Sequence, residues 1–286
     1  MRRPPAVAGT WYPGDAGRLT RAVDGYLSAA GTPPRLEPVV GVIAPHAGLM
    51  YSGPVAGHAY AALAGCPPDL VVLVGPSHYL AFDGVAVWPK GAFDTPLGPL
   101  QVDAEAASRL MARMRLARDL PAAHAREHSL EMQLPFLARL HPGVPILPIV
   151  MGLQERDTIV ELADALAEVC AGRAAVLVAS SDLSHFFDAN TADRLDGRVA
   201  DLVRDFDGDG LLAELERYPE YDRGRYVMCG GGPAVSVMLA ASRLGARESR
   251  VLRRANSGDV SGDYDRVVGY LAAAFGGSLV SAEATT

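Results

Sequence analysis

The sequence predicts a single α/β domain in which helices flank a central, largely parallel or mixed sheet. Two observations carry this prediction. Short continuous runs of branched apolar residues recur along the 286-residue chain, as expected of strands that are buried on both faces. Between several of these runs lie stretches whose apolar residues follow helical spacing, and such alternation of strand and helix is typical of α/β folds.

The expected elements follow in order along the chain. A first helix is predicted over Asp15–Ala29, with Asp15 as its N-cap and Gly31 as its stop, and a turn over residues 31–38 leads into the first core strand. The predicted strands are Val39–Ala44, Leu70–Val74, Val85–Trp88, Ile146–Val150, Ala175–Ala179, Arg250–Ala255 and Val267–Leu271. The further predicted helices are Asp103–Arg115, Leu130–Leu140, Asp157–Cys170, Ala192–Asp205 and Pro233–Leu244.

No feature of the chain predicts a division into domains. Internal repeats, low-complexity tracts and long linkers rich in Pro, Gly or Ser are absent from the sequence, so residues 1–276 are expected to form one domain. After Gly276 the composition becomes small and polar, which predicts a flexible C-terminal tail over residues 277–286.

Composition and charge exclude some functions. Hydrophobic residues make up 49% of the chain and charged residues 21%, which is ordinary for a globular protein and leaves both an enzyme and a binding module open. The formal net charge is -7, and the basic residues are scattered. Because binding to nucleic acid requires Lys and Arg clustered on one face, the chain is not expected to bind nucleic acid.

The cysteines and the N-terminus bear on the compartment. The three cysteines, Cys66, Cys170 and Cys229, are an odd number without repeated spacing, which argues against a disulfide framework. The first 14 residues lack the apolar run of ~7–15 residues that a signal peptide needs. No segment approaches the ~20 apolar residues of a membrane helix. A cytoplasmic protein without membrane contact is therefore expected.

Histidines follow three of the predicted strands. His46 comes two residues after the first strand, His78 four residues after the second, and Asp182 and His185 shortly after the strand that ends at Ala179. Because the carboxyl ends of strands in open α/β sheets converge on one crevice, these side chains are expected to meet there. Imidazole is a good ligand for Zn, Fe, Cu and Ni.

A cysteine beside a glycine run is the fourth such feature. Cys229 precedes Gly230, Gly231, Gly232 and Pro233, and a helix N-terminus near Pro233 would favour its thiolate. That environment suits a metal ligand or a reactive thiol. Taken singly, each histidine is also typical of a hydrogen-bonded structural residue, and Cys229 of a small buried hydrophobe. The glycine run is a weak signal for nucleotide binding, because no Lys-Ser or Lys-Thr follows it.

The segment from Glu127 to Pro135 has two interpretations. Leucines recur at helical spacing from Leu130 onward, while Glu127, His128 and Glu131 lie near the start of the predicted helix, where carboxylates complement the helix dipole. These three residues are either capping and surface charge or part of a site. Structural roles are favoured for the remaining histidines, which are expected within or at the end of helices or in a polar loop: His58, His141 and His124.

A hydrolytic triad is a further alternative. Ser181, Asp182 and His185 contain the three residue types, but adjacency in sequence is not the geometry of a triad. The G-x-S-x-G elbow of the α/β-hydrolases is also missing. The sequence therefore gives this interpretation little support.

Taken together, these motifs resemble the Memo family, which includes the protein B members encoded with a radical-SAM partner in microbes. The resemblance runs nearly from end to end, and several motifs in order make it more specific than any one of them. The segments that carry it are residues 8–12 (AGTWY), 43–48 (IAPHAG), 75–78 (GPSH), 127–135 (EHSLEMQLP), 180–185 (SSDLSH) and 229–230 (CG).

The resemblance implies a fold like that of the class III extradiol dioxygenases and a non-heme iron site. By motif, His46 and His78 match the two metal-binding histidines and Cys229 matches the cysteine that completes the site. Asp182 and His185 match residues of the pocket beside the metal. The dioxygenases have a carboxylate where Cys229 stands, and the softer thiolate should tolerate copper and zinc better than a carboxylate does.

Three functions are compatible with these residues. The leading hypothesis is an oxidoreductase of the extradiol-dioxygenase type that binds Fe(II) through His46, His78 and Cys229 and acts on a small molecule, with His185 as general acid and base and Asp182 orienting His185 or a water. Glu127 and His128 complete the expected catalytic group. The second is a non-catalytic protein that retains copper or iron and binds a partner protein or peptide. The third is a zinc hydrolase, in which Glu127 or His185 is the general base.

Overall fold

The computed structural model describes residues 1–32, 36–65 and 67–277. The predicted tail over residues 277–286 lies, except for Gly277, outside the described residues, as does Cys66. The strands are β1 (Arg2–Arg3), β2 (Val39–Ala44), β3 (Leu70–Pro76), β4 (Val85–Val87), β5 (Ala92–Phe93), β6 (Leu100–Gln101), β7 (Ala117–Asp119), β8 (Ile146–Met151), β9 (Ala175–Ser180), β10 (His185–Phe187), β11 (Glu248–Asn256) and β12 (Val267–Gly276).

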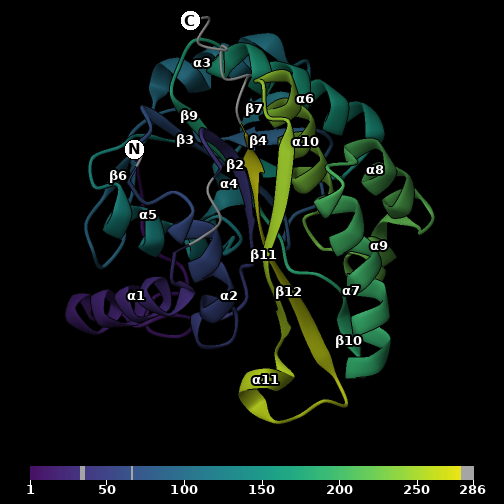
Figure 1. Ribbon diagram of the computed structural model, residues 1–286. Coiled ribbons are helices and arrows are strands. Elements are labelled where there is room, and N and C mark those ends of the chain that lie inside the picture. Colours follow the sequence, from purple (N-terminus) through teal and green to yellow (C-terminus); the bar gives the residue numbers. More distant parts are fainter. Residues whose placement is uncertain (33–35, 66, 278–286) are drawn as a thin grey trace, which may run out of the picture.

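Helices connect most of these strands (Figure 1). They are α1 (Ala16–Ala30), α2 (Leu49–Ala61), α3 (Ala104–Arg113), α4 (Pro121–Ala125), the short 3-10 helix η1 (Glu131–Gln133), α5 (Leu134–Leu140), α6 (Arg156–Cys170), α7 (Ala189–Arg204), α8 (Gly208–Glu216), α9 (Glu220–Tyr226), α10 (Gly231–Arg243) and α11 (Gly258–Ser261). No helix within the described ranges has the length and apolar character needed to cross a membrane.

The main sheet is mixed, as predicted. Its strands follow the order β10-β12-β2-β9-β3-β8-β4-β7, and β11 pairs with β12. The four central strands β2, β9, β3 and β8 are parallel, whereas β12 runs antiparallel to β2 and β4 antiparallel to β8. All seven strands expected from apolar runs are present. The parallel centre places the carboxyl ends of β2, β3 and β9 at the same edge.

The predicted helices are also present, with small shifts at their ends. The Asp15 side chain accepts a hydrogen bond from the Arg18 backbone N–H at 2.8 Å, and Gly31 ends the helix with a φ of 66°, so both predicted caps of α1 are confirmed. In place of the single helix predicted over Leu130–Leu140, the structure has two consecutive helices, η1 and α5. Helix α2 was missing from the expected series because it is apolar on most of its surface and contains Pro54, so it has no amphipathic period.

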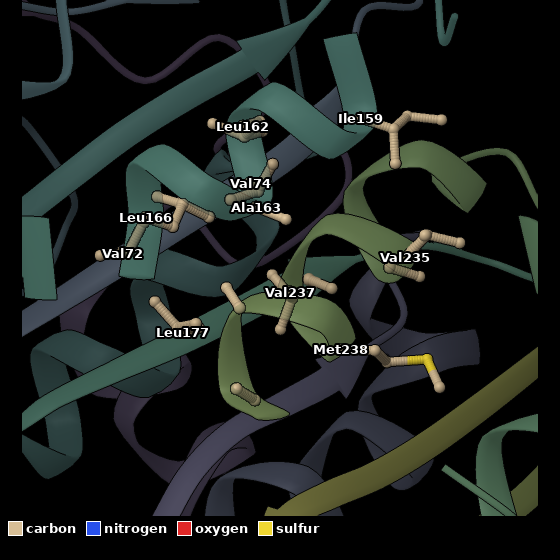
Figure 2. Packing of buried hydrophobic residues seen from close by; sticks show 14 of the residues in the cluster. Val72, Val74, Ile159, Leu162, Ala163, Leu166, Leu177, Val235, Val237 and Met238 are labelled. Carbon is tan, nitrogen blue, oxygen red and sulfur yellow. The ribbon is translucent and has the colours of Figure 1, made fainter. Parts of the chain in front are cut away.

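Helices cover both faces of the sheet. On one face, α6 and α10 pack against β3 and β9, where Leu162, Leu166 and Val237 meet Val72 and Leu177 (Figure 2). On the other face, α1, α2 and α5 enclose a second apolar cluster. Because the central strands are buried on both faces, their sequences are continuous apolar runs and not alternating patterns. The candidate site therefore stands on a rigid, doubly covered sheet.

Candidate metal centre

The loops that follow β2, β3 and β9 converge, as the sequence predicted, since His46, His78, Asp182 and His185 line one cavity. His46 follows β2, His78 follows β3, and Cys229 lies just before α10. One ligand atom from each of these three residues lies within 4.8 Å of the other two. The parallel strands set this geometry, because they bring loops that are far apart in sequence to the same edge of the sheet.

Hydrogen bonds orient the His46 ring. The Ser180 hydroxyl donates to the Ser129 carbonyl at 2.6 Å, and the same oxygen accepts from the Gln133 side-chain amide at 2.8 Å. Since the only hydroxyl proton is used, the oxygen must accept from His46 Nδ1, which lies 2.9 Å away. Nδ1 therefore carries a proton, and Nε2 faces Cys229 Sγ at 3.2 Å.

Glu127 orients the His78 ring in a similar way. The Glu127 carboxylate lies 2.9 Å from His78 Nδ1 and also accepts the His78 backbone N–H at 2.6 Å. Burial opposes ionisation of Glu127, but hydrogen bonds and the charge of His78 lower its pKa to about 2. An ionised carboxylate only accepts, so Nδ1 of His78 is the donor and Nε2 remains available. Carboxylates hold metal-binding histidines in this manner.

The Cys229 turn is held from two sides. Its backbone N–H donates to the Asp182 carbonyl at 3.2 Å, and Gly230 N–H donates to the Ser181 hydroxyl at 2.8 Å. On the other side, the Gln154 amide donates to the Cys229 carbonyl at 2.7 Å and accepts from Gly232 N–H at 2.6 Å. The thiol is thereby directed toward the two histidines.

The electrostatics of the cluster favour a thiolate and a cation. Burial raises the pKa of the Cys229 thiol, but the charge and hydrogen bond of His46, together with His78, lower it to about 6. Burial lowers the pKa of His78, but hydrogen bonds to Cys229 and Glu127 raise it to about 10. Both shifts arise because a thiolate and imidazoles lie close together. The thiolate is the form of cysteine that binds metals.

The donor set fits a single metal ion. At bond lengths of about 2.0–2.3 Å, two ligands of one ion are at most about 4.6 Å apart, so the 3.2 Å between Cys229 Sγ and His46 Nε2 suits neighbouring ligands. Once they release their protons, the two Nε2 atoms and the Cys229 thiolate are ligands that iron, copper and zinc all accept. The geometry does not distinguish these metals.

Glu127, His78 and His128 form a second close group, but it is a poorer metal site. The Glu127 carboxylate already accepts four hydrogen bonds: from the His78 ring and backbone, and from the backbone N–H groups of His128 and Ser129. Three of these bonds fall on Oε1 and one on Oε2, so the carboxylate is already largely engaged. Glu127 is 2% exposed, so the interpretation as surface charge is wrong, whereas its bonds to the His128 and Ser129 backbone do cap this segment.

His128 lies directly beside the cluster. Its ring stacks on His78 with 4.4 Å between centroids and contacts Trp11 at 4.3 Å. Burial and the charges of His46 and His78 lower its pKa to about 3, so the ring is neutral. Its catalytic role stays a prediction.

Asp182 holds a loop of the cluster and is not bonded to His185, and its expected role in orienting a water stays a prediction. Its Oδ1 accepts the backbone N–H groups of His46 at 2.7 Å and Ala47 at 3.3 Å, and no hydrogen bond joins it to His185 within the described residues. The carboxylate therefore fixes the loop that carries His46. His185 is held instead by the Gly224 carbonyl, 2.9 Å from Nδ1. Since a carbonyl only accepts, Nδ1 is protonated and the Nε2 lone pair is free to accept a proton.

The structure gives no support to a Ser-His-Asp triad. The Ser181 hydroxyl donates to the Asp182 carbonyl at 2.8 Å and accepts from Gly230 N–H, so it is not positioned by His185. The glycine run likewise has a packing explanation. A Cβ at Gly230 would lie 2.3 Å from the Ser180 carbonyl oxygen, and one at Gly232 would lie 2.6 Å from Met151 sulfur.

Two cavities meet at the cluster. A cavity of about 250 Å³ is lined by His46, His78, Asp182, His185 and further residues that include Trp11 and His128. A wider one of about 530 Å³ is lined by His78 and Cys229 together with residues of the Tyr79 and Tyr221 segments. His78 lines both, so the candidate centre is accessible from two sides. An open coordination position would have room for a small molecule.

Sequence reasoning missed the residues that support the site from the N-terminus. Glu131 is fully buried and accepts hydrogen bonds from the Arg3 guanidinium at 2.6 Å, the Tyr12 hydroxyl at 2.8 Å and the backbone N–H groups of Ala6 and Val7. This binds the first residues of the chain to the segment that carries Glu127 and His128. An arginine has no local signature of burial, so only the tertiary contact identifies the pair.

His124 gives this region a pH-dependent stability. It lies in α4 and is buried, not in a polar loop as expected, and its Nε2 donates to the Ala86 carbonyl at 3.2 Å while Nδ1 has no partner in the described part of the chain. Burial and the charge of Arg3 lower its pKa to about 3, although Ala86 and the charge of Glu127 act in the opposite direction. The folded protein therefore holds this ring uncharged.

We expect the free energy of unfolding to fall as the pH falls from about 6.5 to about 3, because the unfolded chain binds a proton at His124 and the folded chain does not. Above pH 6.5 this contribution is constant. Urea unfolding of wild type and His124→Gln at pH 4.5–8 measures the difference. The wild type should lose up to about 1.4 kcal/mol per pH unit more than the variant below pH 6. Parallel curves for the two proteins would contradict this assignment.

The fold and the site together define an α/β protein with a candidate His-His-Cys metal centre at the carboxyl edge of its sheet. The model of the Memo-like protein family matches residues 3–274. The chain belongs to the Memo family.

Relatives match over almost their whole length. The chain is 37% identical to a MEMO1 family protein from Methanopyrus kandleri, over 96% of this chain and 99% of that one. It is 40% identical to a MEMO1 family protein from Methanosarcina mazei, over 94% and 97%. Among solved structures, an uncharacterized protein from Escherichia coli K12 shares the fold with a TM-score of 0.51 at 14% identity, over 73% of this chain and 86% of that chain.

Proposed function

We propose that the chain is a mononuclear non-heme metal protein that acts as an Fe(II)-dependent oxidoreductase of the extradiol-dioxygenase type on a small molecule. The observation that carries the proposal is the orientation of the two imidazoles. His46 and His78 each use Nδ1 for a hydrogen bond, so both leave Nε2 for the Cys229 sulfur. A metal ion that replaced the Nε2 protons would be bound by both rings and by the thiolate.

The residues around the cluster suit this chemistry. Fe(II) bound by His46, His78 and Cys229 would supply the one-electron chemistry that dioxygen requires. His185 lines the smaller cavity with its Nε2 lone pair free, so it can take a proton from a substrate hydroxyl and return it later. Asp182 keeps the His46 loop in place, and Glu127 keeps the His78 ring in place.

The broader setting of the protein belongs to the same proposal. Likeness to the class III extradiol dioxygenases in fold, a radical-SAM partner system and a cytoplasmic location are what the resemblance and composition imply. The likeness in fold to the dioxygenases is supported by the mixed sheet, which carries the cluster at the carboxyl ends of its parallel strands.

One observation favours a second function, the retention of copper or iron without catalysis. The third ligand is a thiolate, which is softer than the carboxylate of the dioxygenases and binds copper well. By contrast, the zinc-hydrolase hypothesis is weakened, because Glu127 is a poor candidate for its general base. Glu127 accepts four hydrogen bonds and is buried, which leaves only His185 for that task.

Oxygen consumption tests the proposal. We expect the iron-loaded protein to consume oxygen with at least one member of a panel of catechols, and His185→Gln to lower the rate about 10²- to 10⁴-fold with the metal content unchanged, since a general acid or base contributes that much. Cys170→Ala, which alters a buried thiol away from the cluster, is the control. A full iron load without uptake on any catechol would favour retention of metal. Loss of metal in His185→Gln would make His185 a ligand.

A further inference from the structure

Three arginines each lie over an aromatic ring of a segment that borders one of the two cavities. The Arg126 guanidinium carbon is 5.1 Å from the centre of the Tyr79 ring. Arg266 is 5.5 Å from the ring of Phe186. The third, Arg225, lies over two rings, at 5.1 Å from Phe187 and 5.6 Å from Tyr226.

Each pair is connected to the candidate centre. Tyr79 lines the wider cavity, and its ring packs edge-on against His128 with 5.9 Å between centroids. Arg225 follows Gly224, which lines the same cavity and holds His185. Phe186 follows His185 directly, 55% exposed and with a φ of 66°. That left-handed conformation is costly for a phenylalanine, and such strain is concentrated at functional sites.

These arginines have no acidic partner in the described part of the chain. Most other exposed arginines are paired, as in Arg113 with Glu168 and Arg139 with Asp24. No hydrogen bond or ion pair involves the Arg126, Arg225 or Arg266 side chains there, although the whole chain carries a formal charge of -7. The positive charge of these three arginines is therefore not neutralised by an acidic side chain in the described part of the chain.

Carboxylates that face the cavities are already engaged. Glu127 accepts four hydrogen bonds, and Asp182 accepts two backbone N–H groups at the His46 loop. Glu220, which lines the wider cavity, accepts the Gln154 backbone N–H at 2.6 Å. None of the three forms an ion pair with the arginines. Stacking on a ring occupies the face of a guanidinium but leaves its in-plane N–H groups free, which suits bidentate binding of a carboxylate or phosphate.

We propose that the site binds a small organic anion, whose carboxylate or phosphate group is held at the cavity mouth by Arg126, Arg225 and Arg266. The exposed rings of Tyr79, Phe186 and Tyr221 then offer apolar surface to the rest of the ligand. This inference rests on the proposed function in one respect, that the centre acts on a small molecule.

Calorimetric titration with three probes that share a phenyl ring tests the anion preference: benzoate, phenyl phosphate and the neutral benzyl alcohol. The full chain is titrated both as purified and after removal of metal, so that direct binding to a metal does not contribute in the second case. We expect at least one anion to bind more tightly than benzyl alcohol in both cases, and to bind more weakly as NaCl is raised, because salt screens exposed charges. The stronger of the two anions identifies carboxylate or phosphate as the recognised group.

Variants assign the preference to the three arginines. The triple variant Arg126→Gln, Arg225→Gln, Arg266→Gln should bind the preferred anion about tenfold or more weakly and leave benzyl alcohol unchanged, whereas Arg18→Gln, at an exposed and likewise unpaired arginine of α1, should bind like wild type. Equal affinity for the three probes, or a triple variant that binds like wild type, overturns the inference. Anion binding in a protein that takes up no metal supports the inference and contradicts the proposed function. Full metal binding without a preference for anions would agree with the proposed function and overturn the inference.

Discussion

Replacing Cys229 with serine is expected to remove bound metal almost completely. The hydroxyl of serine is a poor ligand at neutral pH, and the two histidines alone leave the ion with too few protein ligands. Changes of residues that merely support ligands lower metal affinity about 10- to 100-fold, so loss of a ligand should lower it by at least about 100-fold. His46→Ala should have the same effect.

Elemental analysis measures this prediction on protein purified anaerobically without chelator. Wild type should contain near-stoichiometric iron or copper. Cys170→Ala is the matched control, because Cys170 is also a free thiol but is buried in α6, in the apolar cluster. Circular dichroism should show both site variants folded, since Cys229 lies in a loop at the edge of the sheet. Wild-type protein that contains no metal and takes none up would refute the candidate centre. Unfolding of His46→Ala or Cys229→Ser would instead indicate a structural role.

Glu131→Gln is expected to lower the free energy of unfolding by about 3–5 kcal/mol, the usual cost of breaking a buried ion pair by removing one partner. Arg3 is 1% exposed and Glu131 is fully buried. The Arg3 guanidinium also donates to the His124 and Glu127 carbonyls, so it cannot turn to solvent without losing these bonds. The amide group of glutamine would in addition place a donor opposite one of the N–H groups of Ala6 and Val7.

Urea unfolding at pH 7 measures this loss. The control is Glu168→Gln, which breaks the ion pair to Arg113 between two exposed side chains and should cost less than about 1 kcal/mol. The double variant Arg3→Met, Glu131→Leu should lose less than the sum of the two single changes, because it leaves no unpaired buried charge. A change below about 1 kcal/mol in Glu131→Gln would show that water reaches Arg3 and that the N-terminal segment is not held by this pair.

The Cys229 and Glu131 predictions test different parts of one site. Cys229 belongs to the atoms that would touch a metal, whereas Glu131 holds the N-terminal segment against the Glu127–His128 turn. Trp11, on that segment, lines the smaller cavity and contacts His128. A partial loss of this packing should therefore alter the cavity before it alters the metal ligands.

The class of fold and the candidate ligand residues can be predicted from the sequence alone. Strands such as Val39–Ala44 and Leu70–Val74 are recognisable because burial on both faces demands continuous apolar runs, which is a local property. His46 and His78 are recognisable because they directly follow these strands, and a parallel sheet brings such positions to one edge. Cys229 is recognisable from its glycine-rich turn before a helix.

The surroundings of these three residues depend on tertiary contacts that no local sequence pattern reveals. The ring orientation of His46 depends on Ser180, Ser129 and Gln133, which hydrogen bonds across three separate segments bring together. The burial of Arg3 against Glu131 joins residues 128 positions apart, and Arg126, Arg225 and Arg266 lie over rings that the local sequence does not identify. Hydrogen bonds and charge pairs act through distance in space, and a charged side chain has the same local pattern whether it is buried, paired with a neighbour or free to bind a ligand.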